Sequence, residues 1–206
     1  MITKNAKAFW NRISKKPNWL QYILPKRTSD EFEQEGKLQA AAILSLFPLN
    51  GGTVIDYGCG IGRITRYMSE RATRTVGLDI CEAFVKKARL RDTTSEYATS
   101  DTFKEENIAD FVYCISVMQH NTFTNRKKIM AHIYKILKQG GTCLVSFAHG
   151  PVYREGGFIH KFSEKEVIEL ASGFTKVTLI KSNLVQYGGY TIPDGEMNEL
   201  ILMAAK

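Results

Sequence analysis

The chain alternates between two patterns of apolar and polar positions. Short runs of apolar or β-favouring residues recur along it and predict strands. The predicted strands are 53–57, 75–78, 96–99, 110–117, 142–147, 175–181 and 199–204. Between most of them, apolar residues recur every three or four positions, as on one face of a helix. This alternation predicts a parallel sheet flanked by helices. The 110–117 run is almost continuously apolar, which is typical of a strand covered on both faces.

Capping signals mark the ends of several predicted helices. Thr28 and Glu31 have the spacing of a capping box, and so do Ser163 and Glu166. The glycine pair at 140–141 predicts a left-handed helix end. The predicted helices are 5–24 with an interruption at Pro17, 28–47, 61–72, one through Phe84, Val85 and Ala88, one through Ile129, Ile133, Ile136 and Leu137, and one through Val167, Ile168 and Leu170. Residues 182–198, which contain three glycines and a proline, predict a loop.

Length and composition favour one soluble globular domain. The chain has 206 residues, of which 44% are hydrophobic and 24% charged. No apolar run approaches the roughly 20 residues that span a bilayer, and the first residues lack the apolar core of a signal peptide. We therefore expect a cytoplasmic protein. The four cysteines form no C-x-x-C pair and no cluster with histidine, which predicts buried free thiols and no metal site.

The positive charge of the chain is concentrated near its beginning. Residues 1–29 carry seven lysines and arginines and no acid, whereas the remainder has 21 basic and 21 acidic residues. Such a segment could seek an anion such as nucleic acid, a phosphorylated substrate or a membrane surface. It could equally be a solvated helical face. Its aromatic residues could stack on bases, anchor the segment to the core or help to cover a site.

The stretch from Asp56 to Gly62 is the clearest chemical signal. A predicted strand reaches Asp56, glycines follow at alternate positions (Gly58, Gly60 and Gly62), and an amphipathic pattern then begins. Glycine permits left-handed backbone and close approach, so such a turn can place backbone N–H groups beside a ligand. A second acid, Asp79, closes the next predicted strand 21 residues after Gly58. A nucleotide-binding α/β fold places a ribose-binding carboxylate at about that distance.

These residues resemble the first motif of class I S-adenosylmethionine-dependent methyltransferases, acid-x-Gly-x-Gly-x-Gly. A dinucleotide-dependent oxidoreductase would need G-x-G-x-x-G, with its third glycine where Arg63 stands. It would also not need Asp56. An acid beside the sulfonium of the methyl donor is favourable, whereas an acid beside a pyrophosphate is not. The resemblance therefore implies S-adenosyl-L-methionine as cofactor and S-adenosyl-L-homocysteine as product, and we expect no metal.

The resemblance covers residues 38–206. Within this range, residues 136–141 are similar to the family's Leu-Lys-Pro-Gly-Gly turn, with Gln139 in place of proline. The resemblance implies an α/β fold, a three-layer αβα sandwich with a Rossmann-like seven-stranded, mostly parallel sheet whose last strand is antiparallel. Residues 1–37 lie outside it. We expect them to form a basic and aromatic helical segment that either covers the site as a lid or only anchors to the core.

The resemblance also implies which residues bind the cofactor. The three glycines would line its methionine part, Asp79 would accept hydrogen bonds from the ribose hydroxyls, and Asp56 would order the turn and the cationic end. Ile80 would pack against adenine and Asp101 would lie near its amine. The predicted cofactor-binding residues are Asp56, Gly58, Cys59, Gly60, Gly62, Asp79, Ile80, Asp101, Ile115 and Ser116. For Asp79 and Asp101 the alternatives are a helix-capping acid and a solvated loop acid.

Methyl transfer by in-line displacement needs alignment and exclusion of water, and a base only if the acceptor arrives protonated. His120, after the predicted strand 110–117, is the candidate base because its ordinary pKa suits proton removal near neutral pH. It could also serve packing alone. Loops at the carboxyl edge of the sheet carry specificity in such folds. His149, Tyr153 and Tyr187 are therefore the candidate acceptor residues, with ordinary surface loops as the alternative.

The sequence thus predicts an S-adenosylmethionine-dependent methyltransferase that acts on an O, N or S nucleophile of a small molecule, because no substrate-recognition domain is visible. One alternative is methylation of RNA or protein gripped by the basic segment. Another is a cofactor-binding module without transferase activity. A nicotinamide-dependent oxidoreductase is the remaining alternative, against which Asp56 and Arg63 both argue.

Overall fold

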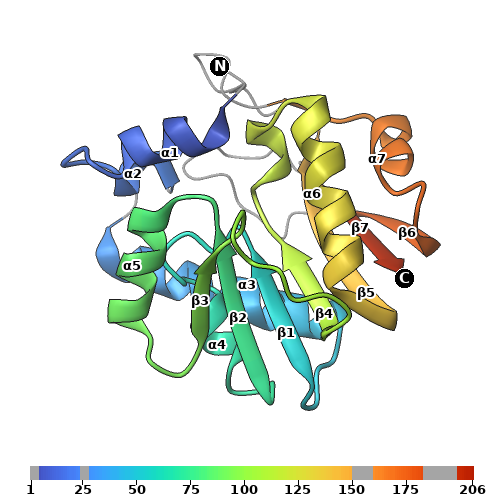
Figure 1. Cartoon of the computed structure of the whole chain (residues 1–206), viewed down its shortest axis with the longest axis horizontal. Coiled ribbons are helices and arrows are strands. Elements are labelled where there is room, and N and C mark those ends of the chain that lie inside the picture. The colour runs from blue at the N-terminus through green and yellow to red at the C-terminus, as the bar shows by residue number, and fades with distance from the viewer. Residues whose placement is uncertain (1–4, 24–27, 150–159, 183–198) are drawn as a thin grey trace. The chain divides into compact units, whose positions relative to one another are not determined.

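The computed structural model describes residues 5–23, 28–149, 160–182 and 199–206 (Figure 1). The chain divides into two compact units, an amino-terminal unit built mainly of residues 7–104 and a carboxy-terminal unit built mainly of residues 105–206. The described residues contain all seven predicted strands, which belong to a mixed sheet with helices around it. The predicted α/β fold class is therefore confirmed.

The amino-terminal unit is a parallel three-stranded layer with helices packed on it. Its main elements are β1 (Thr53–Tyr57), β2 (Arg74–Asp79), β3 (Glu96–Thr99), α3 (Ser29–Leu46), α4 (Thr65–Met68) and α5 (Glu82–Arg91). The strand order is β3-β2-β1, with Thr53 opposite Arg74 and Val76 opposite Glu96. Helix α5 packs on β2 and β3, and α4 packs on β2 and α3. Figure 1 shows α3 passing behind β1 and β2.

The beginning of the chain is helical and is docked by aromatic side chains. Helices α1 (Ala6–Ile13) and α2 (Leu20–Ile23) replace one continuous helix, so the predicted interruption near Pro17 is confirmed. Trp10 and Trp19 pack against Phe84 of α5, with ring centroids 6.2 and 5.6 Å apart. Large apolar rings lose water on such packing, which stabilises the docked segment. The predicted boundary between residues 37 and 38 stays a prediction.

In its described residues, the carboxy-terminal unit contains four strands and two α-helices. Its elements are β4 (Ala109–Cys114), the 3₁₀ turn η1 (Met118–His120), α6 (Phe123–Ile136), β5 (Leu137–Ala148), α7 (Glu164–Leu170), β6 (Thr175–Ser182) and β7 (Glu199–Ala205). The strand order is β4-β5-β7-β6; β4 is parallel to β5, and β7 is antiparallel to both of its neighbours. The predicted antiparallel last strand is confirmed. Residues 111–114 of β4 are fully buried, as a strand covered on both faces should be.

Both predicted capping boxes are present. Thr28 Oγ1 accepts a hydrogen bond from the Glu31 N–H at 3.3 Å, and the Glu31 carboxylate accepts from the Thr28 N–H at 2.8 Å. Ser163 and Glu166 repeat this arrangement at 3.3 and 2.8 Å. Each box satisfies donors at a helix start that the helix itself leaves unpaired.

Two predicted element boundaries were wrong because left-handed residues interrupt the regular backbone. The helix predicted over 61–72 is limited to α4, since Gly62 has φ +77° and residues 60–64 form turns. The strand predicted over 110–117 ends at Cys114, because Ser116 has φ +60° and η1 follows. Apolar periodicity does not distinguish such turn residues from the elements beside them.

The predicted helix end at 140–141 was also wrong. Helix α6 ends at Ile136, and Leu137 is already extended, with φ −64° and ψ 137°. Leu137 pairs with Ala109, and the register with β4 then shifts before Phe111 pairs with Thr142. Gly140, with φ +78°, lies in this irregular part of β5. Its left-handed conformation therefore serves a bulge in the strand instead of a helix cap.

Candidate functional site

The predicted glycine turn lies between β1 and α4 and is left-handed at each glycine. Gly58, Gly60 and Gly62 have φ values of +89°, +57° and +77°. The N–H groups of Gly58 and Cys59 both donate to the Leu78 carbonyl, at 2.6 and 3.0 Å, which fixes the turn to β2. Residues other than glycine rarely adopt this left-handed backbone conformation. The sequence therefore uses glycine where the backbone geometry demands it.

The last two glycines of this turn, Gly60 and Gly62, meet different surroundings. A Cβ atom added to Gly62 would overlap the Tyr97 side chain, whose hydroxyl donates to Asp92 at 2.8 Å. A Cβ atom added to Gly60 would meet nothing within 4 Å. Gly62 is thus required by internal packing, whereas Gly60 borders open space. Open space beside a tight glycine turn lets a ligand approach the main chain closely.

Asp79 connects the end of β2 to this turn. Its carboxylate accepts hydrogen bonds from the Gly60 N–H at 2.9 Å and from the Cys81 N–H at 2.8 Å. Only 9% of the residue is exposed, and burial raises the pKa of its carboxyl group to about 6, against the effect of these hydrogen bonds. The predicted ribose-binding acid therefore also holds the glycine turn and the first residues before α5.

Asp56 is a second buried acid behind the turn. It is 3% exposed, and its carboxylate accepts a hydrogen bond from Thr65 Oγ1 of α4 at 2.6 Å. This contact links the end of β1 to the helix that follows the glycines. The neighbouring Cys59 is buried, and burial raises the pKa of its thiol well above the ordinary value. Cys59 is therefore a neutral packing group and has no thiolate for nucleophilic chemistry.

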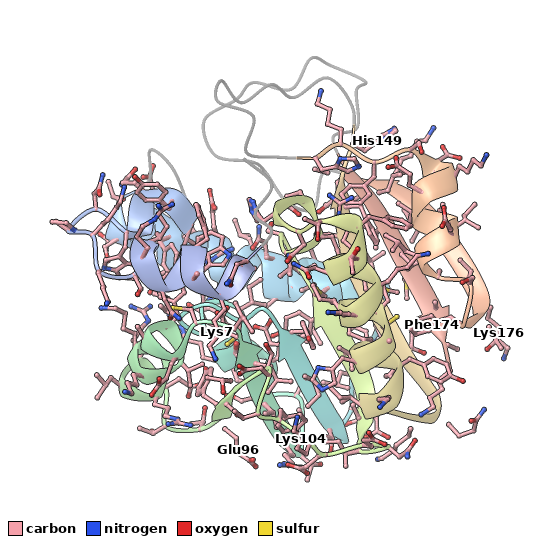
Figure 2. The ribbon with its side chains drawn as sticks, turned by 45° about the horizontal axis from the view of Figure 1, so that its top comes forward. Lys7, Glu96, Lys104, His149, Phe174 and Lys176 are labelled. Atoms are coloured by element: carbon pink, nitrogen blue, oxygen red, sulfur yellow. The ribbon has the colours of Figure 1, made fainter. Side chains whose placement is uncertain are left out.

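Asp101 follows β3 and is paired with the beginning of the chain. Lys7 of α1 donates to its carboxylate at 2.5 Å, and this hydrogen bond lowers the pKa of Asp101. Figure 2 labels Lys7 among the side chains of the amino-terminal unit. The pair is partly exposed, at 50% for Lys7 and 37% for Asp101, so its contribution to stability is small. Ile80, which is half-buried, lies between Asp79 and the start of α5.

The remaining predicted cofactor residues and the candidate base belong to the carboxy-terminal unit. Ile115 is buried, and the Ser116 N–H donates to Ser146 Oγ of β5 at 3.0 Å. Ser116 is a left-handed residue other than glycine, a conformation that is uncommon and concentrates at functional sites. His120 is the last residue of η1 and is half-buried. All predicted roles in cofactor binding and catalysis stay predictions.

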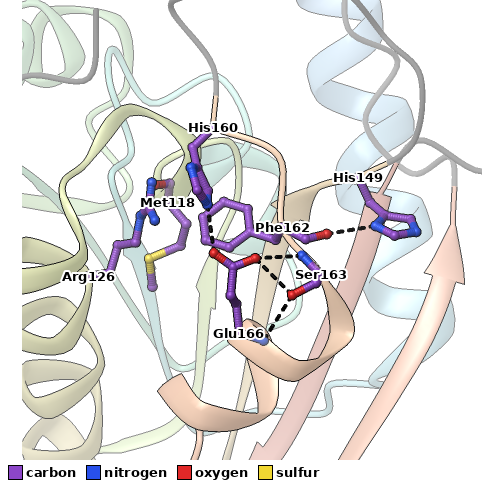
Figure 3. A network of polar contacts seen from close by, with 7 residues as sticks. All are labelled: Met118, Arg126, His149, His160, Phe162, Ser163 and Glu166. Carbon is purple, nitrogen blue, oxygen red and sulfur yellow. Dashed lines mark hydrogen bonds and ion pairs between the residues drawn. The ribbon is translucent and has the colours of Figure 1, made fainter.

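His149 follows β5 and its Nδ1 lies 2.7 Å from the Phe162 carbonyl oxygen (Figure 3). Tyr153 and Tyr187, the other predicted acceptor residues, lie outside the described residues. Figure 3 also shows a group of side chains that the sequence did not single out as a site. His160 Nε2 lies 3.0 Å from the Glu166 carboxylate, and the Arg126 guanidinium lies 4.4 Å from the centre of the Phe162 ring.

Arg126 carries a signal that sequence reasoning missed. It precedes Met130 and Ile133 of α6 by four and seven positions, so it falls on the apolar stripe of that helix, and it is only 3% exposed. An arginine on the buried face of a helix is unusual unless it has a partner or a function. Apolar periodicity alone does not reveal a charged residue on such a stripe.

Residues 55–145 match the family described as "Methyltransferase domain". This part of the chain is similar to a methyltransferase domain. The chain is 30% identical over 122 residues to phosphoethanolamine N-methyltransferase 1 of Caenorhabditis elegans, an alignment that covers 56% of this chain and 25% of that protein. It is 27% identical over 120 residues to malonyl-[acyl-carrier protein] O-methyltransferase of Salmonella typhimurium, covering 56% of this chain and 48% of that protein. The matched part thus spans a quarter to a half of these relatives.

A solved structure extends the similarity to almost the whole chain. Phosphoethanolamine N-methyltransferase 2 of Haemonchus contortus, in complex with S-adenosyl-L-methionine, superimposes with a TM-score of 0.71 and 19% identity, over 99% of this chain and 60% of that one. At this identity the likeness establishes the fold. The resemblance to class I methyltransferases that Asp56 and the glycines predicted is therefore confirmed for the domain.

Within the described ranges, no three His, Cys, Asp or Glu side chains gather in a way that could hold a metal ion. The same ranges contain no helix long and apolar enough to cross a membrane. The four cysteines are buried and free, as predicted.

Proposed function

We propose that the methyltransferase domain of this chain binds S-adenosyl-L-methionine and transfers its methyl group to an O, N or S nucleophile of a small molecule. The observation that carries this proposal is the left-handed glycine turn held by the Asp79 carboxylate. Such a turn brings main chain, open space and a carboxylate to one place, and a carboxylate is the group that accepts hydrogen bonds from ribose hydroxyls. The relatives named as N- and O-methyltransferases support it.

The residues present fit the cofactor. Gly60 leaves room beside the turn because a Cβ atom there would meet nothing within 4 Å. Asp79 has carboxylate oxygens for the ribose hydroxyls, Ile80 offers apolar surface for adenine, and Asp56 places negative charge behind the turn. When bound, the cofactor supplies a methyl group already activated on a positively charged sulfur. The chain then has to hold the acceptor in line with that methyl group and keep water away.

Asp101 can accept a hydrogen bond from the adenine amine only in competition with Lys7. Since Lys7 donates to its carboxylate at 2.5 Å, the adenine amine would share or replace that contact. This pairing, together with Trp10 and Trp19 on α5, supports a role for residues 1–37 as a cover of the cofactor site. Replacing Lys7 by methionine should change the affinity for S-adenosyl-L-homocysteine, and an unchanged affinity would leave the segment only an anchoring role.

The basic segment does not favour a polyanionic substrate. Lys7 is engaged with Asp101, the Arg12 guanidinium lies over Phe9, and Lys16 donates to the Tyr22 hydroxyl at 2.7 Å. These three of the seven basic residues of the segment thus serve contacts within the protein. A small-molecule acceptor is therefore the better proposal, in agreement with the phosphoethanolamine enzymes among the relatives. Four free cysteines support, as a further part of the proposal, the predicted cytoplasmic location.

Titration calorimetry with S-adenosyl-L-homocysteine and with NAD tests the cofactor. The wild-type chain should bind the former and not the latter, and Asp79→Ala should weaken binding by about 1–3 kcal/mol, the scale of hydrogen bonds to a charged group. Asp110→Ala is the matched control, because it removes a partly exposed carboxylate that pairs with Lys138 at the start of β4. Failure of the wild type to bind S-adenosyl-L-homocysteine would overturn the proposal.

We infer that His120 is the base if the acceptor arrives protonated. It is the last residue of η1, the turn that follows β4 at the edge where ligands bind in α/β folds. His120→Ala should lower the maximal rate of methyl release at neutral pH by about 10²–10⁴-fold, with unchanged affinity for S-adenosyl-L-homocysteine. An undiminished maximal rate would leave His120 a packing role. A chain that binds cofactor but releases no methyl group with any acceptor would favour the non-catalytic module.

A further inference from the structure

Two hydrogen bonds hold the backbone of η1, and buried polar side-chain atoms beside them have no partner. Arg126 Nε donates to the Met118 carbonyl at 3.1 Å, and the His160 N–H donates to the Gln119 carbonyl at 3.0 Å. Arg126 Nη2 and both polar atoms of the Gln119 amide have no hydrogen-bond partner in the described part of the chain. The exposed fractions of the two residues are only 3% and 1%. Two neighbouring buried groups thus lack partners.

The nearby acid does not resolve this deficit. The Glu166 carboxylate accepts from the Ser163 N–H and Oγ at 2.8 and 2.9 Å, and it lies 3.0 Å from His160 Nε2. Figure 3 shows these contacts beside Arg126. Glu166 does exert an attraction on the Arg126 charge, but burial outweighs it and lowers the pKa of the guanidinium. A buried charge without full hydrogen bonding is costly, so its retention points to a function.

The Arg126 guanidinium is also held in a defined orientation. It stacks over the Phe162 ring at 4.4 Å while Nε is fixed on Met118. The position is suitable for an acceptor, because β4 and β5 are parallel and their carboxyl ends meet at one edge of the sheet. The η1 turn follows β4 and His149 follows β5 at that edge. Ligands of open α/β sheets bind there.

We propose that Arg126 and Gln119 bind a carboxylate or phosphate group of the methyl acceptor. This inference rests on the proposed function and narrows its substrate to an anionic small molecule. Arg126 Nη2 and the Gln119 amide nitrogen donate to the oxygens of the anion, and Gln119 Oε1 accepts from a hydroxyl or amine of the same ligand. A guanidinium matches both kinds of anion in geometry and charge.

Thermal unfolding of the full chain in sodium phosphate, sodium acetate and sodium chloride, at equal ionic strength and pH, tests the site. Phosphate or acetate should raise the unfolding temperature above the value in chloride, and the more effective anion identifies the group. Calorimetric affinity for that anion should fall at least tenfold in Arg126→Gln and in Gln119→Leu. Lys127→Gln is the matched control, since it removes a neighbouring exposed charge of α6 that lies 3.5 Å from Glu169, and it should bind as the wild type does.

Two further readouts separate a binding site from a structural role. Gln119→Leu should not lower the unfolding temperature in chloride, because it removes polar atoms that have no partner; a lower temperature would indicate a structural hydrogen bond and overturn the inference. Both variants should keep their affinity for S-adenosyl-L-homocysteine. Equal anion binding by the variants and the wild type, or no preference for either anion over chloride, would also overturn it. Loss of S-adenosyl-L-homocysteine binding by the wild type would instead reject the proposed function. Should Arg126→Gln fail to fold, Gln119→Leu decides alone.

Discussion

The ionisation of Asp79 offers the most informative test of the cofactor site. Burial raises the pKa of this carboxyl group from 3.8 to about 6 in the folded chain. Since the folded state then binds the proton more tightly than the unfolded state, the contribution to stability is present below pH 3.8 and is lost as the pH rises through about 6. The shift corresponds to about 3 kcal/mol, of which about 1.4 kcal/mol is lost between pH 5 and 7.5.

Asp79→Asn removes this titration while it keeps the shape of the side chain. The difference in unfolding free energy between wild type and variant, measured by urea denaturation, should therefore change by about 1.4 kcal/mol between pH 5 and 7.5, to the disadvantage of the wild type at the higher pH. Asp110→Asn, which alters a partly exposed acid paired with Lys138, should run parallel to the wild type over this range.

Affinity should show the opposite preference for pH. If only the ionised carboxylate accepts both ribose hydrogen bonds, the wild type should bind S-adenosyl-L-homocysteine about tenfold more weakly at pH 5 than at pH 7.5. Asp79→Asn should bind more weakly at pH 7.5, by about 1–3 kcal/mol, and should show no such pH dependence. Parallel pH profiles for the two proteins in titration calorimetry would refute the assignment of Asp79 to the cofactor.

Two further predictions concern the residues around the turn. Gly60→Ala has space for its methyl group, so it should reduce stability only by the left-handed backbone penalty of about 1–2 kcal/mol, yet weaken S-adenosyl-L-homocysteine binding at least tenfold. Gly62→Ala should lower the unfolding temperature more, because its methyl group meets Tyr97. The reverse order of the two variants in thermal unfolding would contradict this prediction. Thr65→Val should reduce the free energy of unfolding by about 1–3 kcal/mol, since Asp56 loses a buried 2.6 Å hydrogen bond. Thr65→Ser should retain most of the unfolding free energy. A urea midpoint unchanged in Thr65→Val would show that the hydrogen bond contributes nothing to stability.

Most of the fold was predictable because its signals are local. The apolar runs predicted all seven strands, and the spacing of Thr28 with Glu31 and of Ser163 with Glu166 predicted two helix starts. The errors arose where a single backbone angle decides the outcome. The left-handed conformation of Ser116 ends β4 earlier than predicted, and a serine in the sequence does not indicate such a conformation.

Only the part of the candidate site that depends on the spacing of its glycines and acids was predictable from the sequence. The spacing predicts Asp79 and Gly60 as site residues, and the structure adds the hydrogen bond between them. Gln119 and Arg126 were not singled out, because a missing hydrogen-bond partner is a property of the folded interior. Only the packing of η1, α6 and the residues before α7 reveals it.

The two capping boxes give the starts of α3 and α7 their own hydrogen-bond partners. In each case two N–H groups at the helix start are satisfied by side chains within four consecutive residues. Substitutions, insertions or segments exchanged between homologues immediately upstream should therefore leave both helices intact. New acceptor preferences could evolve ahead of Ser163 with little penalty to the scaffold, which makes this junction a natural graft point for altering specificity.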